Sequence, residues 1–233
     1  MSAGITRGAA SILIAVSTAL VIVGVSIAPF LNPIWVGFEQ GRSHASEWTG
    51  YTPIQLKVAT DGILADLVFG PPTFDVQVDG QPVLNERERS HMADVRGVFA
   101  GFAALVGIAI IVLLVAATAS RRSARRTFWQ SVRSGSGALA VGTVVAGAVG
   151  LVAFDSAFDV FHRLFFAGGT YTFDPRTDRL VQLFPDQFWL ETSLAVGGVI
   201  LVLSTVTWWF AARRRAVDER SRVGVGRVVE AQG

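Results

Sequence analysis

Long stretches without a charged side chain dominate the hydrophobic pattern of this 233-residue chain. No Asp, Glu, Lys or Arg occurs in four runs, which cover residues 8–38, 97–120, 134–154 and 192–212. Each run is longer than the roughly 20 apolar residues that a helix needs to cross the hydrocarbon core of a bilayer. The pattern predicts an α-helical membrane protein with four transmembrane helices, and it excludes a soluble globular enzyme.

The segments between these runs differ in charge. Residues 31–96 hold nine acids against five basic residues, and residues 155–191 hold six acids against three. Arginines collect instead after the second and fourth runs, at Arg121, Arg122, Arg125, Arg126 and Arg133 and at Arg213, Arg214, Arg215, Arg220, Arg222 and Arg227. Cytoplasmic flanks of membrane spans are enriched in Lys and Arg, so we expect both termini in the cytoplasm and two acidic loops outside.

The composition of the chain excludes several kinds of chemical site. Hydrophobic residues make up 51% of the chain and charged residues 16%, and there is no cysteine. Disulfides, thiolate metal sites and a cysteine nucleophile are therefore excluded. Basic clusters beside membrane spans are typical of orientation and of contact with anionic lipid, so we expect membrane lipid and no nucleic acid as a partner.

The acidic segment between the first two spans is too long for a simple connector. Thr60-Asp61 predicts the start of a short helix over residues 62–69, which Gly70-Pro71-Pro72 would end. Phe74, Val76 and Val78 then alternate with polar residues up to a hairpin signal, Asp79-Gly80. These signals predict a small α/β extracytoplasmic cap.

The second membrane helix is predicted to begin before its apolar run. Asn85 and Glu88 have the spacing of a capping box, which places the helix start near Glu86. His91 and Asp94 then share one helix face, about 10 Å above the apolar run. Arg96 lies at the membrane edge, where it is expected to bind lipid phosphate or to snorkel.

The third span is predicted to continue as an amphipathic helix. Phenylalanines recur at three- and four-residue spacings, at Phe154, Phe158, Phe161 and Phe165. Asp155, Asp159 and His162 share a second stripe, which puts His162 about 12 Å past Phe154. His91 and His162 thus reach a similar height on the same side of the bilayer, each with a carboxylate three residues away. Because histidine exchanges protons near neutral pH, this pair is the chemical centre of the sequence. His44, in a stretch rich in glycine and serine, has no such partners.

Three segments together suggest a family. They are His91-Met92-Ala93-Asp94-Val95-Arg96, Phe161-His162-Arg163-Leu164-Phe165-Phe166 and Leu183-Phe184-Pro185-Asp186-Gln187-Phe188-Trp189. In this order they resemble the bacterial four-span integral membrane family that includes the lipoprotein intramolecular transacylase (Lit), over roughly residues 10–212. The resemblance implies an acyltransferase in the bacterial cytoplasmic membrane, acting on diacylglyceryl lipoproteins without a cofactor. It moves the sn-2 acyl chain of a diacylglyceryl-cysteine to the α-amino group, and its two functional histidines would be His91 and His162.

The residues suit this chemistry. One histidine can take a proton from the amine and the other can give one to the leaving glyceryl oxygen, with Asp94, Asp155 and Asp159 as supporting carboxylates. Arg163 or Arg96 is expected to stabilise the oxyanion. Two alternatives stay open: a metal-dependent lipid-modifying enzyme that uses His91, Asp94, Asp159 and His162 as ligands, and a non-catalytic assembly or binding protein. Neither a metal nor a cofactor is expected in the favoured interpretation.

The chain is expected to divide at the ends of its charge-free runs. Residues 1–30 form the cytoplasmic N-terminus and a first span that is retained as an anchor, because no small-x-small cleavage site follows it. The remaining segments are the cap (31–93), the second span (94–120), a basic cytoplasmic loop (121–135), the third span (136–156), an outer amphipathic segment and loop (157–191), the fourth span (192–212) and a cytoplasmic tail (213–233).

Overall fold

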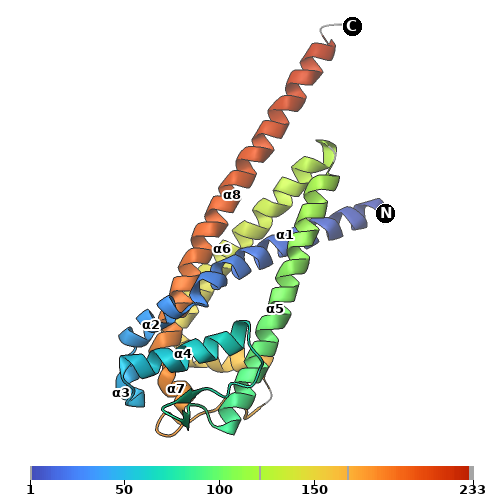
Figure 1. Ribbon diagram of the computed structural model, residues 1–233. Helices are drawn as coiled ribbons and strands as arrows, with labels where there is room; N and C mark the ends of the chain where they lie inside the picture. The colour runs from blue at the N-terminus through green and yellow to red at the C-terminus, as the bar shows by residue number, and fades with distance from the viewer. Residues whose placement is uncertain (1, 121, 167, 231–233) are drawn as a thin grey trace. The chain divides into compact units, whose positions relative to one another are not determined.

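The computed structural model describes residues 2–120, 122–166 and 168–230, and the side chains of residues 8–120, 124–166 and 168–216 within them. Arg121 and the side chains of Arg122, Arg220, Arg222 and Arg227, which the topology prediction uses, lie outside the described part. The chain is mostly helical (Figure 1), and the described residues contain four helices that are long and apolar enough to cross a membrane. The prediction of four spans is confirmed at this level.

The four candidate spans belong to the longest helices. They are Gly8–Phe30, which combines most of α1 (Ser2–Ile27) with the short 3-10 helix η1 (Ala28–Phe30); Glu86–Ala119, which is α5; Ala124–Phe165 in α6 (Arg122–Phe165); and Asp186–Ala216 in α8 (Asp186–Glu230). Residues 122–135 of the predicted basic loop are helical and form the first turns of α6. This stretch contains no Pro and is rich in arginine, which is a good helix former, so a helix can run through it.

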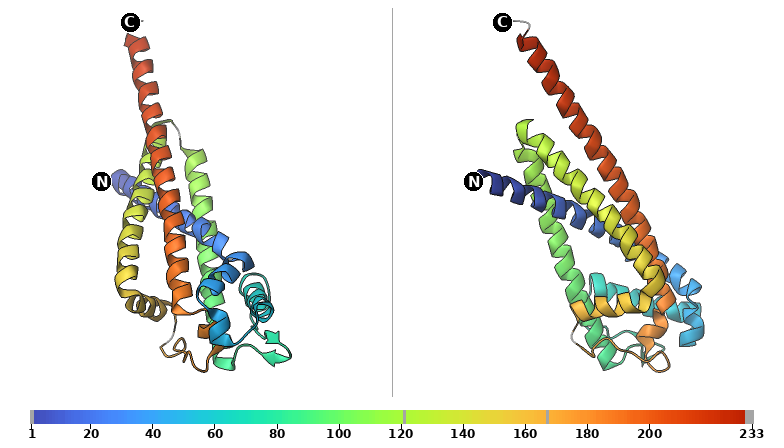
Figure 2. Two further views of the ribbon diagram at one scale, coloured as in Figure 1. Left: turned by 90° about the vertical axis from the view of Figure 1, so that its left-hand side faces the viewer. Right: turned by 180° about the vertical axis from the view of Figure 1, so that it is seen from behind.

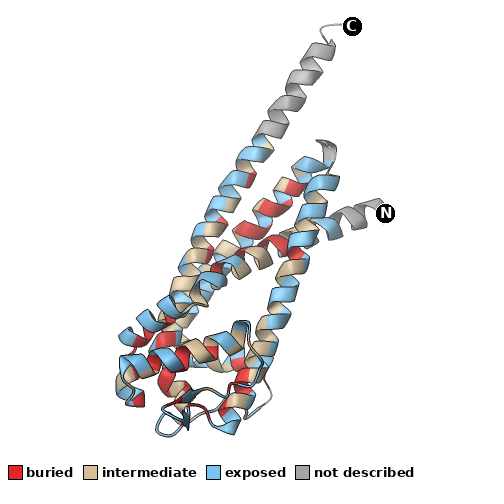
Figure 3. Cartoon of the chain, in the orientation of Figure 1, coloured by how far each residue is buried: buried red, intermediate tan, exposed pale blue. Residues whose placement is uncertain are grey.

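The chain forms two compact units. The first contains residues 1–26, 103–145 and 197–233 and includes the more apolar stretches of α1, α5, α6 and α8. Gly135 lies against the backbone of Ala15, where a Cβ would collide, so a glycine allows α1 and α6 to approach closely. Many apolar residues of these helices are exposed, and Figure 3 colours exposed residues pale blue along them, which suits helices surrounded by lipid.

The second unit contains residues 27–102 and 146–196. It holds α2 (Pro33–Arg42), α3 (Ala45–Thr49), α4 (Pro53–Val68), the strands β1 (Gln77–Val78) and β2 (Gln81–Pro82), and α7 (Arg179–Leu183), together with the adjoining ends of α5, α6 and α8. Its apolar core includes Ile63, Phe74, Leu84 and Leu183, each at most 2% exposed. The candidate functional residues all lie in this unit.

The region predicted as a cap has more helix than expected. The helix predicted over residues 62–69 begins at Pro53, because Thr52 and Gln55 form a capping box and Pro53 occupies the first turn. Helices α2 and α3 were not predicted. Asn32 caps α2 by accepting hydrogen bonds from the N–H groups of Ile34 and Trp35.

The predicted strand before the hairpin is shorter than expected. Only Gln77 and Val78 pair with Pro82 and Gln81, and Asp79 and Gly80 make the turn with φ values of 52° and 75°. Phe74 cannot continue the strand, because its φ of 48° is left-handed and its N–H donates to the side chain of Asp66. Its side chain is nevertheless fully buried.

Candidate functional site

His91 is held by the start of α5. The Asn85 Oδ1 accepts a 3.0 Å hydrogen bond from the Glu88 N–H, and the Glu88 Oε2 accepts a 2.7 Å bond from the Asn85 N–H. This is the predicted capping box, and α5 begins at Glu86 as expected. The second oxygen of Glu88 accepts a 2.6 Å bond from the Leu180 N–H, which ties the helix start to α7. His91 lies one turn later on the same face.

His162 is carried by the last part of α6, beyond a break in the helix. Ala153 has φ −143° and ψ 48°, so the stretch that follows turns away from the stretch before it (Figure 2). The predicted height of His162 assumed that the third span continues as a straight helix, and this break contradicts that assumption. The break lets residues 154–165 run across the unit and bring His162 toward the start of α5.

The two imidazoles lie together. Their ring centroids are 6.1 Å apart and the ring planes are inclined by 25°. His91 is 5% exposed and His162 is 9% exposed. The structure thus brings together two histidines that are 71 positions apart in the sequence. Their catalytic role remains a prediction.

The two rings differ in their hydrogen bonds. His162 Nδ1 lies 2.8 Å from the carbonyl oxygen of Phe158, one turn earlier in α6. A carbonyl can only accept, so Nδ1 carries the proton and Nε2 of the neutral ring is left as an acceptor. His91 Nδ1 is buried and has no hydrogen-bond partner among the described residues. A buried polar atom of this kind needs a partner, which a bound substrate could supply.

Aromatic rings surround the imidazoles. We define the aromatic box as Phe158, Phe166, Tyr171 and Phe173. Phe166 contacts both histidines, with centroids 4.8 Å from His91 and 5.5 Å from His162. Phe173 lies 5.4 Å from His91, whereas Phe158 and Tyr171 lie 4.0 and 5.1 Å from His162.

Sequence reasoning gave no role at the site to three members of this box, although Phe166 stands in one of the family segments. Phe158 belongs to the helical period that predicted the extension of α6. Phe166, Tyr171 and Phe173 instead follow the helix in a segment that contains Gly168 and Gly169. For Tyr171 and Phe173 the signal in the sequence was a cluster of aromatic residues just after a candidate catalytic histidine.

The carboxylates do not orient the imidazoles as expected. Asp159 pairs with Arg163 at 2.6 Å and accepts a 3.4 Å hydrogen bond from the Tyr171 hydroxyl. The carbonyl of Phe158 takes the place on His162 that was predicted for Asp159, because a ring four residues along a helix reaches the carbonyl directly. Asp94 and Asp155 are exposed.

The two arginines predicted to stabilise an oxyanion have different environments. The Arg96 guanidinium donates to the carbonyl of Asp66 in the last turn of α4, so it joins two helices. Arg163 is 69% exposed and shares Asp159 with Tyr171, which lies on His162. Of these two arginines, Arg163 is the one linked to the histidine pair through described contacts.

A metal would need a converging set of donors. The described residues contain no group of three or more His, Asp or Glu side chains placed to share one ion. His91 and His162 face aromatic carbon rather than carboxylate oxygen. The proposed ligand set of His91, Asp94, Asp159 and His162 is therefore not assembled.

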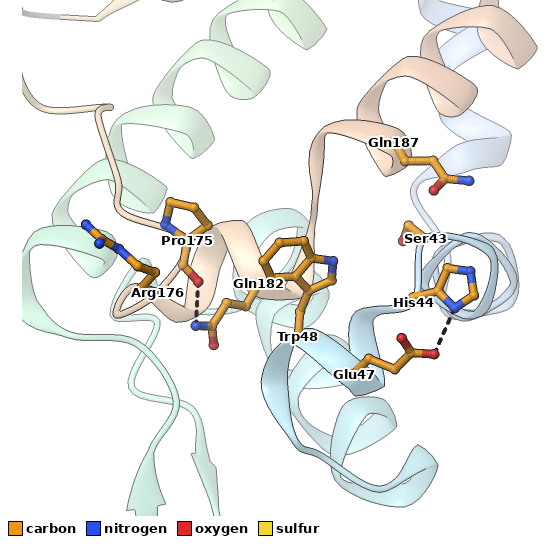
Figure 4. Close-up of a pocket in the computed structure, with 8 residues that line it drawn as sticks. All are labelled: Ser43, His44, Glu47, Trp48, Pro175, Arg176, Gln182 and Gln187. Carbon is orange, nitrogen blue, oxygen red and sulfur yellow. Dashed lines mark hydrogen bonds and ion pairs between the residues drawn. The ribbon is translucent and has the colours of Figure 1, made fainter.

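An open depression lies elsewhere on the second unit (Figure 4). Its lining residues are Ser43, His44, Glu47, Trp48, Pro175, Arg176, Gln182 and Gln187. His44 Nδ1 lies 3.0 Å from Glu47 Oε1, and both side chains are exposed. The depression is lined by neither His91 nor His162. An exposed histidine–glutamate pair of this kind is typical of a solvated surface.

Comparison with known proteins identifies the family. Residues 12–189 match the family model described as "Lipoprotein intramolecular transacylase Lit". A search of the curated proteins finds no match. Among solved structures, the chain is similar to the membrane integral lipoprotein intramolecular transacylase Lit from Bacillus cereus, with a TM-score of 0.73, 18% identity, and 94% of this chain and 99% of that chain covered.

Two variants of the Bacillus cereus protein give the same result. One carries a histidine-to-arginine substitution and matches with a TM-score of 0.75 and 16% identity, covering 94% of this chain and 96% of that chain. The other carries a histidine-to-alanine substitution and matches with a TM-score of 0.75 and 17% identity, covering 94% and 97%. At these identities the likeness establishes the fold, and the family model covers most of the chain. The chain is a multi-pass membrane protein that belongs to the lipoprotein intramolecular transacylase (Lit) family.

Proposed function

We propose that this protein is a lipoprotein intramolecular transacylase with His91 and His162 as its catalytic residues. Its substrate is a diacylglyceryl lipoprotein, and the sn-2 acyl chain moves to the α-amino group of the modified cysteine. The product is an N-acylated lyso-form lipoprotein. The observation that carries the proposal is the pair of imidazoles 6.1 Å apart inside the aromatic box, in a chain of this family.

The reaction needs one proton to be moved. The neutral amine attacks the ester carbonyl, the nitrogen–carbon bond forms, and the bond from that carbon to the glyceryl oxygen breaks. The amine gives up a proton and the glyceryl oxygen takes one. A neutral imidazole can take up this proton and pass it on to the glyceryl oxygen.

The hydrogen bond to Phe158 suggests how the two roles are divided. Because His162 Nδ1–H is already donated, its Nε2 is the acceptor that would take the proton from the amine. The proton would then pass from His162 through His91 to the glyceryl oxygen. The tetrahedral oxyanion needs a cation or an N–H group, and Arg163 is the nearer candidate of the two arginines because Asp159 and Tyr171 connect it to His162.

No nucleophilic side chain is required by this chemistry. The ester and the amine belong to the same molecule, and holding them in position gives effective molarities of about 10⁵ M or more for well-oriented groups. Asp94 and Asp155, which are exposed, would act on the site only through their charge. In this proposal His91, His162 and Arg163 carry out the reaction, and no step requires a metal or a cofactor.

The distribution of arginine supports an orientation. We infer that both termini are cytoplasmic and that residues 31–93 form the extracytoplasmic cap, with the site at the outer surface of the bacterial cytoplasmic membrane. Lipoprotein acyl chains would then reach His91 and His162 from the outer leaflet. The division into spans and loops by residue number is part of the same proposal.

The decisive experiment follows the N-termini of lipoproteins. The chain is expressed in bacteria that lack a transacylase, and lipopeptides are analysed by mass spectrometry. We expect N-acylated lyso-lipoprotein with the unmodified protein. A missing general acid or base costs about 10² to 10⁴ in rate, so His91→Ala and His162→Ala should remove the product, while His44→Ala should not.

Controls separate loss of chemistry from loss of protein. Each variant is quantified in the membrane fraction and its thermal stability is measured after purification. Asp159→Asn should lower the activity without abolishing it, since this residue does not contact the imidazole. Product formation at the normal rate in both alanine variants would overturn the catalytic assignment. Absence of product with the unmodified protein would instead leave a non-catalytic binding protein as the better interpretation.

A further inference from the structure

Two helices of the second unit expose large apolar side chains although they lie outside the four spans. Ile34 and Phe38 on α2 are 86% and 57% exposed, and Ile54 and Val58 on α4 are 77% and 48% exposed. Phe69, directly after α4, is 90% exposed. We call these five side chains the interfacial face. In contact with water, the outer face of such a helix normally carries polar residues.

The opposite sides of the same helices pack into the core. Val36 of α2 and Leu56, Ala59 and Ile63 of α4 are buried together, and α2 packs against α4. Both helices therefore have apolar residues on two faces. Packing into the core of this unit explains why one face is apolar, but it does not explain the apolar residues on the exposed face.

Two connections place α2 at the ends of spans. Helix α2 begins at Pro33, three residues after the span Gly8–Phe30. Trp35 Nε1–H donates a 3.2 Å hydrogen bond to the hydroxyl of Thr192, the first residue of the fourth charge-free run. Near Trp35, Phe30 and Phe38 add two more aromatic rings, a composition typical of membrane–water interfaces.

Helix α4 is connected to the second span. Arg96 donates to the carbonyl of Asp66 in the last turn of α4. Gly97, the next residue, begins the second charge-free run. The C-terminal end of α4, including Phe69, is thus fixed where the chain enters the apolar part of α5.

The charges on α4 are compatible with a lipid environment. Between Ile54 and Phe69 the charged residues are Lys57, Asp61 and Asp66. Asp66 accepts hydrogen bonds from the Thr73 hydroxyl and the Phe74 N–H, and Lys57 forms an ion pair with Asp61 one turn along the helix. The pair is neutral as a whole. Amphipathic helices of this kind bury their apolar side about 5–10 Å into the boundary between headgroups and acyl chains.

We propose that α2 and α4 lie in the membrane surface, with the interfacial face in contact with the lipids of the leaflet on that side. The partner is the lipid bilayer itself, because α2 and α4 are connected to the ends of three spans. This inference does not depend on the proposed acyl transfer. It identifies the helices that anchor the second unit to one leaflet.

Spin labelling tests the proposal directly, because the chain has no cysteine of its own. Single-cysteine variants Ile34→Cys, Ile54→Cys and Phe69→Cys are spin-labelled on the full-length protein in vesicles of phosphatidylcholine and phosphatidylglycerol. Gln81→Cys, on the exposed surface of β2, is the matched control. Collision rates are measured with oxygen, which concentrates in the acyl region, and with a water-soluble nickel complex.

The expected result is a contrast between the two groups of labels. At positions 34, 54 and 69 the ratio of oxygen to nickel collisions should be several-fold higher than at position 81. Nickel access at these positions equal to that at position 81 would overturn the proposal. Protection that disappears when the protein is diluted in excess lipid would also overturn it, because a second copy of the chain would then cover the face. A circular dichroism spectrum of each variant verifies that it is folded.

Discussion

The carboxylate of Glu88 accepts a 2.6 Å hydrogen bond from the N–H of Leu180, ninety-two residues further along the chain. Its other oxygen accepts the N–H of Asn85 at the start of α5. Glu88 is 1% exposed, so both bonds are made away from water. One side chain therefore fixes the helix that carries His91 and joins it to α7.

Replacing Glu88 by alanine should destabilise the second unit and lower the activity. The substitution removes a helix cap and leaves the buried N–H of Leu180 unpaired, which together cost about 2–4 kcal/mol. The measurement is the thermal unfolding of the purified protein together with lipopeptide analysis. Glu88→Gln keeps one side-chain acceptor and should lose less stability. Equal stability of the alanine variant and the unmodified protein would contradict this role.

Substitutions at Tyr171 can separate the contribution of its ring to activity from that of its hydroxyl. Its ring covers His162 at 5.1 Å, whereas its hydroxyl contacts Asp159 at 3.4 Å. We expect Tyr171→Phe to keep most of the activity and Tyr171→Ala to lose about tenfold, since an aromatic contact contributes about 0.5–1.5 kcal/mol. Rates of lyso-lipoprotein formation decide the question. Similar loss in both variants would assign the effect to the hydroxyl.

Glu39 should make stability depend on pH. Burial, followed by the hydrogen bond and negative charge of Glu191, raises the pKa of Glu39 above its ordinary value, and Arg42 opposes the shift. The folded protein thus favours the neutral carboxyl. Stability is full below the pKa of an unfolded glutamate, and it falls as the pH rises through the raised pKa. Glu39→Gln should flatten this part of the profile in thermal unfolding measured between mildly acidic and neutral pH. The same slope in the variant would exclude Glu39 as its source.

The topology prediction can be tested with two introduced thiols. Ala124→Cys lies in the arginine-rich start of α6 and Gln81→Cys lies on the predicted outer cap, and both positions are exposed. An impermeant thiol reagent on intact cells should label position 81 and leave position 124 unlabelled. Permeabilised cells should label both, which shows that position 124 can react. Labelling of position 124 in intact cells would reverse the orientation.

Local signals in the sequence predicted much of the helical structure. The absence of charge marked the four spans, and the Asn85–Glu88 spacing marked the first turn of α5. The true start of α4 also has a local signal, since Thr52, Pro53 and Gln55 form the same kind of box. Helix α2 could not be recognised from the sequence because Asn32, which caps it, lies within the charge-free run 8–38. The start of a new helix inside such a run does not change the hydrophobic pattern.

The candidate site depends on features that local patterns do not encode. Ala153 breaks α6 without a proline or glycine at that position, so no residue type predicts the turn. Tyr171 and Phe173 reach the histidines only after the chain turns back beyond α6. The sequence could identify His91 and His162 as a pair by their matching positions at two spans. The rings around them follow from tertiary packing.

The aromatic box has a consequence for the fate of the acyl chain. An ester carbonyl activated beside two imidazoles can be attacked by the α-amine or by water, and attack by water would release a free fatty acid. Aromatic carbon next to His91 and His162 offers few groups that could hold a water molecule in an attacking position. The amine, which is tethered to the ester, has no such need. In the proposed reaction, the packing of Phe158, Phe166, Tyr171 and Phe173 is what favours a transacylase over an esterase.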